Sequence, residues 1–146
     1  MSNSVFVKKN DKCKIKFFVK VDDDGISILS PNQLGKEASL KQKDYDECNL
    51  SVTPLNWGTI CNLQSESHIF DHETGKKAFD GDRYMKSKLR ALIVEWDFTY
   101  KDQDGDDISV EVSDESVSAL HSLVGDYILK EYNKRFEMSE DDRKNS

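Results

Sequence analysis

Apolar and lysine side chains alternate through the segment from Cys13 to Val21. Successive side chains of a β-strand point to opposite faces, so this alternation predicts a strand with one buried face. Phe18 is the one apolar residue on the polar side. A run of aspartates and a glycine follows, and the apolar pattern resumes at Ile26, so we expect a hairpin that ends near Leu29. The chain must therefore build a β element that packs one face against the remaining residues.

A first helix is expected from Thr53 to about Glu66. Thr53 offers an N-cap oxygen, and Pro54 stands in the first turn, where its missing N–H costs nothing. The apolar residues recur at helical spacing, which predicts one face packed in the core. The side chains on that face would be Leu55, Trp57, Ile60 and Leu63.

Two further amphipathic segments predict the remaining helices. The segment from Asp82 to Trp96 carries apolar residues at helical spacing, which predicts a core helix. Ser113 fits the N-cap of a last helix, because acidic residues follow in the first turn, where the helix dipole favours negative charge. The apolar stripe of that last helix comprises Val117, Leu120, Leu123, Val124, Tyr127, Ile128 and Tyr132.

The connecting segments are recognised by their turn-forming residues. Ser30 to Glu47 is expected to be a long connection with a short helical turn, and Asn49 to Thr53 a short strand. Phe70 to Phe79 is a loop by composition. Phe98 to Val112 predicts a second hairpin or an ordered loop around an acidic turn.

A chain of 146 residues has the usual length of one domain. We expect an α+β fold, with an N-terminal β-hairpin or small antiparallel sheet followed by about three helices. Residues 13–137 would form this single domain. A flexible N-terminus (1–12) would precede it, and a disordered polar tail (138–146) would follow it.

Charge and composition limit the partners. The net charge of −7 repels phosphate backbones, so no nucleic-acid partner is expected. No stretch approaches the ~20 apolar residues of a membrane span, and the N-terminus lacks the apolar core of a secretion signal. The three cysteines are an odd number without metal-site spacing, which argues against a disulfide framework or a zinc site and fits a reducing compartment.

Two groups of residues resemble parts of metal sites. The acidic run from Asp102 to Asp107 begins like a calcium loop, but Gly105 stands at its fourth position instead of the sixth. This favours a polar turn and leaves weak cation binding open. His68 and His72 have the spacing of helical metal ligands, but they lie at an expected helix exit without an HExxH pattern. We therefore expect no metal site and no cofactor.

The chain also lacks the motifs of nucleophilic catalysis. It contains no GxSxG sequence and no glycine-rich phosphate loop. Cys61 follows Ile60 on an expected helix, where a cysteine usually acts as a small buried hydrophobic residue. An enzymatic activity is therefore not expected.

One order of elements resembles a known protein family. The residues that carry it are Trp57, Ile60, Phe79, Asp80, Tyr84, the run from Leu92 to Phe98, Asp104, Gly105, the cap from Ser113 to Glu115, Val117, Leu120, Val124 and Ile128. This order resembles that of the tail assembly chaperones, or tail assembly accessory proteins, which many tailed phages encode beside the tape-measure gene. The resemblance extends from Trp57 to Tyr132, roughly half of the chain.

The resemblance implies a non-enzymatic protein in the host cytoplasm. It would bind the apolar helical surface of the tape-measure protein and keep it soluble during tail assembly, a role that suits amphipathic helices on an acidic body. The alternatives are a structural tail or baseplate component of the virion, and a small metal-dependent enzyme built on His68, His72 and the acidic turn. Homo-oligomerisation is left open. The residues expected to frame the protein-binding surface are Trp96, Phe98, Leu120, Val124 and Tyr127.

Overall fold

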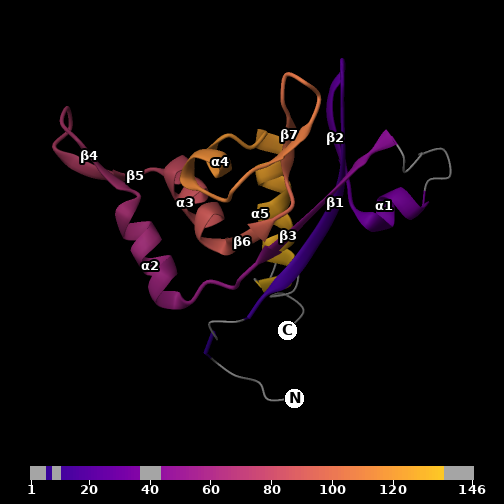
Figure 1. The fold of residues 1–146 in the computed structure, drawn as a ribbon. Helices are drawn as coiled ribbons and strands as arrows, with labels where there is room; N and C mark the ends of the chain where they lie inside the picture. The colour runs from indigo at the N-terminus through magenta and orange to yellow at the C-terminus, as the bar shows by residue number, and fades with distance from the viewer. Residues whose placement is uncertain (1–5, 8–10, 37–43, 137–146) are drawn as a thin grey trace.

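The structure, a computed structural model, describes residues 6–7, 11–36 and 44–136. The predicted polar tail (138–146) and most of the predicted flexible N-terminus (1–12) lie outside these residues. The described part confirms the α+β class, because antiparallel strands dominate its first half and helices its second (Figure 1).

The main sheet has four antiparallel strands in the order β2–β1–β3–β6. They are β1 (Cys13–Asp22), β2 (Gly25–Leu29), β3 (Asp46–Val52) and β6 (Ile93–Trp96). The first two form the predicted hairpin. Its turn is closed by the Asp24 N–H, which donates to the Asp22 carboxylate, and Gly25 adopts a φ of 125° that side chains disfavour.

Helices cover one face of this sheet and enclose the core. The covering helices are α3 (Gly81–Leu92), α4 (Asp114–Ser118) and α5 (Ser122–Phe136), the last of which crosses behind the sheet in Figure 1. Alternate side chains of β1 and β3 point into this layer, as the period of two requires. The buried core comprises Ile15, Phe17, Leu50, Val52, Leu89, Leu92, Ile93, Val117, Val124, Ile128 and Tyr132.

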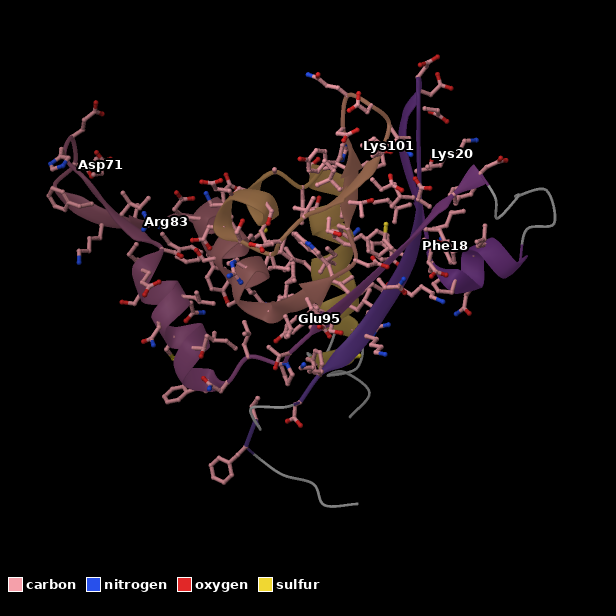
Figure 2. The ribbon with its side chains drawn as sticks, viewed as in Figure 1. Phe18, Lys20, Asp71, Arg83, Glu95 and Lys101 are labelled. Atoms are coloured by element: carbon pink, nitrogen blue, oxygen red, sulfur yellow. The ribbon has the colours of Figure 1, made fainter. Side chains whose placement is uncertain are left out.

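Phe18 is buried on the opposite face of the sheet, with only 5% of its surface exposed. The short helix α1 (Pro31–Lys36) contacts β1 and β2, and Figure 2 shows Phe18 beside it. Ser30 starts this helix with a reciprocal pair of bonds, since its hydroxyl accepts the Gln33 N–H and its own N–H donates to the Gln33 side chain. The expected helical turn after Ser30 is confirmed, and it explains the one apolar residue on the lysine face.

The predicted start of the first helix was wrong. Helix α2 spans Trp57–Glu66, and its N-cap is Asn56, whose side chain accepts the Thr59 N–H at 2.8 Å. Thr53 does not cap the helix, because its hydroxyl donates to the Asp11 carbonyl. Trp57, expected in the core, points outward and is 82% exposed.

The expected loop from Phe70 to Phe79 is instead a two-stranded hairpin, which we call the arm (68–79). Its strands are β4 (His68–Asp71) and β5 (Lys76–Phe79). The Asp80 N–H donates to the Ser67 carbonyl at 2.8 Å and closes the base of the arm. Figure 1 shows the arm projecting from the body beyond α2.

The predicted helix from Asp82 to Trp96 ends at Leu92, and the chain continues as the edge strand β6. Ile93 and Val94 are β-branched, which lowers their helical preference and suits them to a sheet. Pairing with β3 supplies the backbone partners that a longer helix would have supplied. Here the tertiary pairing outweighed the helical spacing of the apolar residues.

The last helix is also shorter than predicted, because it divides into α4 and α5. Ser113 caps α4 as expected, forming a capping box with Ser116. The chain then turns, and His121 restarts the helix: its carbonyl accepts the Val124 and Gly125 N–H groups, and its ring Nδ1 accepts the Leu123 N–H. The predicted second hairpin is confirmed as β7 (Thr99–Lys101) and β8 (Asp107–Ser109).

The burial of Phe18 predicts a stability effect on the lysine face of β1. Phe18→Ala should lower the free energy of unfolding by about 3 kcal/mol, because it removes a buried ring and leaves a cavity under α1. Lys14→Ala, an exposed change on the same face, should stay within about 0.5 kcal/mol of the wild type. Urea unfolding followed by circular dichroism measures both, and equal midpoints for the two variants would contradict the packing of α1.

Candidate functional site

An aromatic row links the end of β6 to α5 through the core. Trp96 stacks on Phe98 with ring centroids 4.6 Å apart, and Phe98 meets the edge of Phe17 at 6.0 Å. Phe17 in turn packs against Tyr127 at 5.1 Å. Four rings from three distant parts of the sequence therefore form one continuous contact, which packs the segment after β6 against the body.

Polar bonds hold this segment in place beside the rings. The Trp96 indole N–H donates to the Val110 carbonyl at 2.6 Å, which ties β6 to the end of the β7–β8 hairpin. The Asp97 carboxylate accepts the backbone N–H of Asn49 at 2.8 Å and its side-chain amide at 2.9 Å. The Trp-Asp-Phe sequence thus joins three structural elements.

An open cleft of about 610 Å³ lies next to this segment. Its walls come from β1, β3, the β7–β8 hairpin and the turn between α4 and α5. Val19 and Leu120 contribute apolar surface above the buried ring of Phe17, and Val21 extends that surface to an exposed position. We call this space the cleft.

Three of the five predicted binding residues line the cleft, namely Phe98, Leu120 and Val124. Tyr127 lies behind it, in contact with Phe17. Trp96 faces a separate cavity of about 320 Å³ between β3 and β6. These residues pack on the core or belong to it, so they shape a surface more than they protrude from it. Their role in binding stays a prediction.

Carboxylates on β3 and after β6 surround the Cys48 thiol at the wall of the cleft. Burial, followed by the charges of Asp97, Asp46 and Glu47, raises the pKa of Cys48 to about 11. The Asn49 amide and then Lys16 hold the pKa of Glu47 below its usual value. The electrostatic environment of the cleft wall is therefore negative, and the Cys48 thiol is protonated at neutral pH.

Sequence patterns missed a second apolar surface, which lies on the arm and α2. Ile69, Phe70 and Phe79 are each more than 40% exposed, although they are apolar. His68, Phe79 and Tyr84 pack in a row with successive ring centroids 5.3 and 5.5 Å apart. The sequence did contain one indication of the arm: the Thr74-Gly75 pair, which is typical of a hairpin turn, stands between the short segments 68–71 and 76–79.

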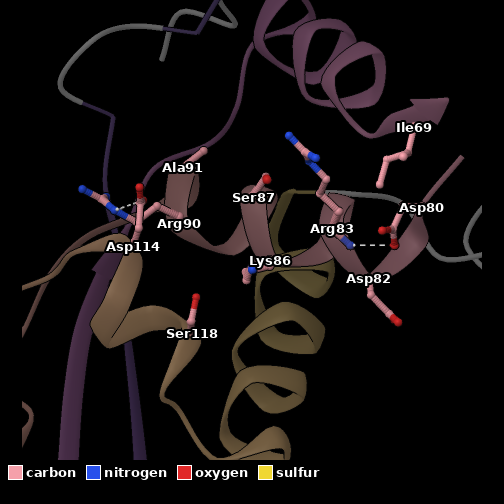
Figure 3. A pocket seen from close by; sticks show the side chains of 10 residues that line it. All are labelled: Ile69, Asp80, Asp82, Arg83, Lys86, Ser87, Arg90, Ala91, Asp114 and Ser118. Atoms are coloured by element: carbon pink, nitrogen blue, oxygen red, sulfur yellow. Dashed lines mark hydrogen bonds and ion pairs between the residues drawn. The ribbon is translucent and has the colours of Figure 1, made fainter.

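A larger cavity, about 850 Å³, lies along the outer side of α3 (Figure 3). Its basic residues, Arg83, Lys86 and Arg90, face three aspartates: Asp80, Asp82 and Asp114. The Arg90 Nε lies 3.2 Å from the Asp114 carboxylate, and the Asp80 carboxylate accepts the Arg83 N–H as the cap of α3. The three basic and three acidic side chains that line this cavity carry no net formal charge.

The residues of the metal-enzyme alternative are not brought together. His68 and His72 are on the arm, which Figure 1 shows well apart from the β7–β8 turn. The His68 Nδ1 bonds the Gln64 carbonyl, and His72 packs against Phe70. In the acidic turn, the Asp102 carboxylate accepts the N–H groups of Asp104 and Asp106. Across the described residues, no three histidine, cysteine or acidic side chains are grouped as metal ligands.

Comparison with known proteins identifies no relative: no protein-family model, curated protein or solved structure matches the chain. Within residues 6–7, 11–36 and 44–136, none of the helices has the length and apolar content needed to cross a bilayer.

The environment of Cys48 predicts slow alkylation. At about pH 8 a pKa near 11 leaves roughly 100-fold less thiolate than the ordinary value of 9.0. The higher nucleophilicity of a basic thiolate recovers part of this loss, so we expect a rate roughly tenfold below that of a peptide thiol. Iodoacetamide labelling of a Cys13→Ser/Cys61→Ser variant across pH measures it. A titration midpoint equal to that of the urea-unfolded protein would contradict the negative environment.

Proposed function

We propose that this protein is a non-enzymatic tail assembly chaperone of a tailed phage, and that it binds an apolar segment of the tape-measure protein in the host cytoplasm. The proposal rests on one observation. Phe98, Leu120 and Val124, which the family resemblance selects, converge on a single open cleft with an apolar floor. A concave apolar surface of this kind accommodates one face of an amphipathic helix.

The size and position of the cleft support this proposal. Its volume of about 610 Å³ is enough for several apolar side chains of a helix, though not for a whole helix. The walls come from elements that the aromatic row holds rigidly, so the surface exists before a client binds. A pre-formed surface of this kind loses little conformational entropy when it binds a partner.

The arm supports protein binding independently. A hairpin with Phe70 and Phe79 about half exposed is unusual for a surface in contact with water alone, because large exposed apolar groups mark interaction sites. Trp57 on the neighbouring helix is more exposed still. The net charge of −7 would keep a complex with an apolar client dispersed.

The proposal predicts how the affinity for the client changes when two apolar side chains of the cleft become polar without a change in charge. Val19→Thr/Val21→Thr keeps the side-chain shape and the charge but replaces two methyl groups with hydroxyls. At about 0.8 kcal/mol for each buried methyl, the affinity for the tape-measure protein should fall about tenfold. Co-expression of the two proteins, followed by affinity capture and measurement of soluble tape-measure protein, gives the result.

Val94→Thr is the matched control, because Val94 is a part-exposed valine of β6 outside the cleft. This variant should capture as much tape-measure protein as the wild type does. If the wild-type protein neither captures the tape-measure protein nor raises its solubility, the proposal is wrong. Mass spectrometry of purified virions distinguishes the chaperone from the structural alternative. Retention of this protein in the virion at stoichiometric copy number would favour a tail or baseplate component.

A further inference from the structure

The charged residues that line the cleft are mostly acidic. Four acidic residues border it, Asp46, Glu47, Asp97 and Asp107, against one lysine, Lys101. Glu47 pairs with Phe18 across β3 and β1, so its carboxylate projects from the opposite face of the sheet. The apolar floor thus lies inside a rim of negative charge. An apolar segment that enters the cleft must bring its own charged or polar side chains close to this rim.

Two of the carboxylates already have cationic partners. Glu47 lies 3.2 Å from the Lys16 ammonium, and Asp107 lies 3.3 Å from the ammonium of Lys101. Asp97 accepts only amide N–H groups, from Asn49, which leave its charge uncompensated. Within the described residues, Asp46 forms no ion pair. Among the described residues that line the cleft, the carboxylates without a cationic partner are therefore Asp46 and Asp97.

The sheet register places Asp46 on the cleft side. Asp46 pairs with Val19 across β3 and β1, and directly paired residues project from the same face of a sheet. Cys48 pairs with Phe17 in the same ladder, so the thiol, Asp46 and the apolar floor share one face. The raised pKa of Cys48 is consistent with this placement, because after burial the charges of Asp97 and Asp46 contribute most to it.

We infer that the segment bound in the cleft is a basic amphipathic helix of the partner protein, whose apolar side chains contact Val19, Leu120 and Val124 while lysine or arginine faces Asp46 and Asp97. This inference rests on the proposed function and specifies the chemistry of its client. Charge complementarity selects such a segment: it strengthens attraction to a basic partner and repels an acidic one. The Asp46 side chain is exposed, so the attraction should weaken as salt increases.

The test uses two synthetic helical peptides with identical leucine positions, one with lysine and one with glutamate at the polar positions. The full-length protein should bind the lysine peptide at least about tenfold more tightly, with the difference shrinking between about 50 and 500 mM salt. The lysine peptide should also slow alkylation of Cys48 in the Cys13→Ser/Cys61→Ser variant, which places binding in the cleft. Equal affinities for the two peptides would overturn the inference.

Asp46→Lys should reduce the affinity for the lysine peptide about tenfold, through loss of one attraction and gain of one repulsion. Asp126→Lys changes the net charge equally at an exposed position of α5 that does not line the cleft, so it should have little effect. Equal effects of the two variants would assign the preference to net charge and overturn the inference.

Failure of the inference and failure of the proposed function give different results. If the tape-measure protein is captured but neither peptide binds, the client binds elsewhere and only the inference fails. If the lysine peptide binds with the expected dependence on Asp46 but the tape-measure protein is not captured, only the proposed function fails. If the protein alone self-associates and thereby protects Cys48, the occupant is a second copy, and the inference is overturned.

Discussion

The ring of Phe17 has no exposed surface and lies where three parts of the chain meet. It belongs to β1, the strand paired with both β2 and β3, and it contacts Phe98 after β6 and Tyr127 on α5. Burial of such a ring contributes about 1.5–3 kcal/mol, and favourable aromatic pairs add about 0.5–1.5 kcal/mol each. This one side chain therefore contacts the sheet, the last helix and the segment that leads into the β7–β8 hairpin.

Phe17 packs directly beneath the cleft, and Val124 belongs both to the core and to the cleft lining, so core and site share residues. This arrangement gives the cleft a fixed shape, and it also limits how the site can vary. A change at Val124 or Phe98 disturbs packing as well as the surface. Variation in specificity is more readily accommodated at exposed positions of the rim, where the side chains of Val21 and Asp46 carry little packing.

Sequence patterns correctly predicted the elements whose formation depends on residues close together in the sequence. The hairpin of β1 and β2 follows from alternation and turn residues, and the cap at Ser113 follows from hydrogen bonding within one turn. The segment from Ile93 to Trp96 could not be assigned in this way, because its apolar residues fit either period and distant pairing with β3 decided the outcome. The turn at His121 likewise depends on bonds that no residue pattern reveals.

The candidate site was predictable only in part for a related reason. Apolar spacing identifies residues that avoid water, but it does not distinguish a core from a surface that awaits a partner. Leu120 and Val124 were selected because they lie on a stripe, and the structure adds that they border an open cleft. Trp57 fitted a stripe equally well, yet it is exposed, and it is the first residue of α2, which Asn56 caps instead of Thr53. The acidic rim required the register of β3, which brings Asp46 beside Val19.

The bond between Ser67 and Asp80 makes the arm a separable module. The Asp80 nitrogen and the Ser67 carbonyl oxygen, which flank segment 68–79, lie 2.8 Å apart, so a shorter or longer excursion could start and finish there between α2 and α3. Such a junction tolerates insertion and exchange, as hairpin bases on rigid scaffolds commonly do. Evolution could therefore replace the arm while the sheet and the cleft remain intact, and one scaffold could acquire new contacts at its periphery.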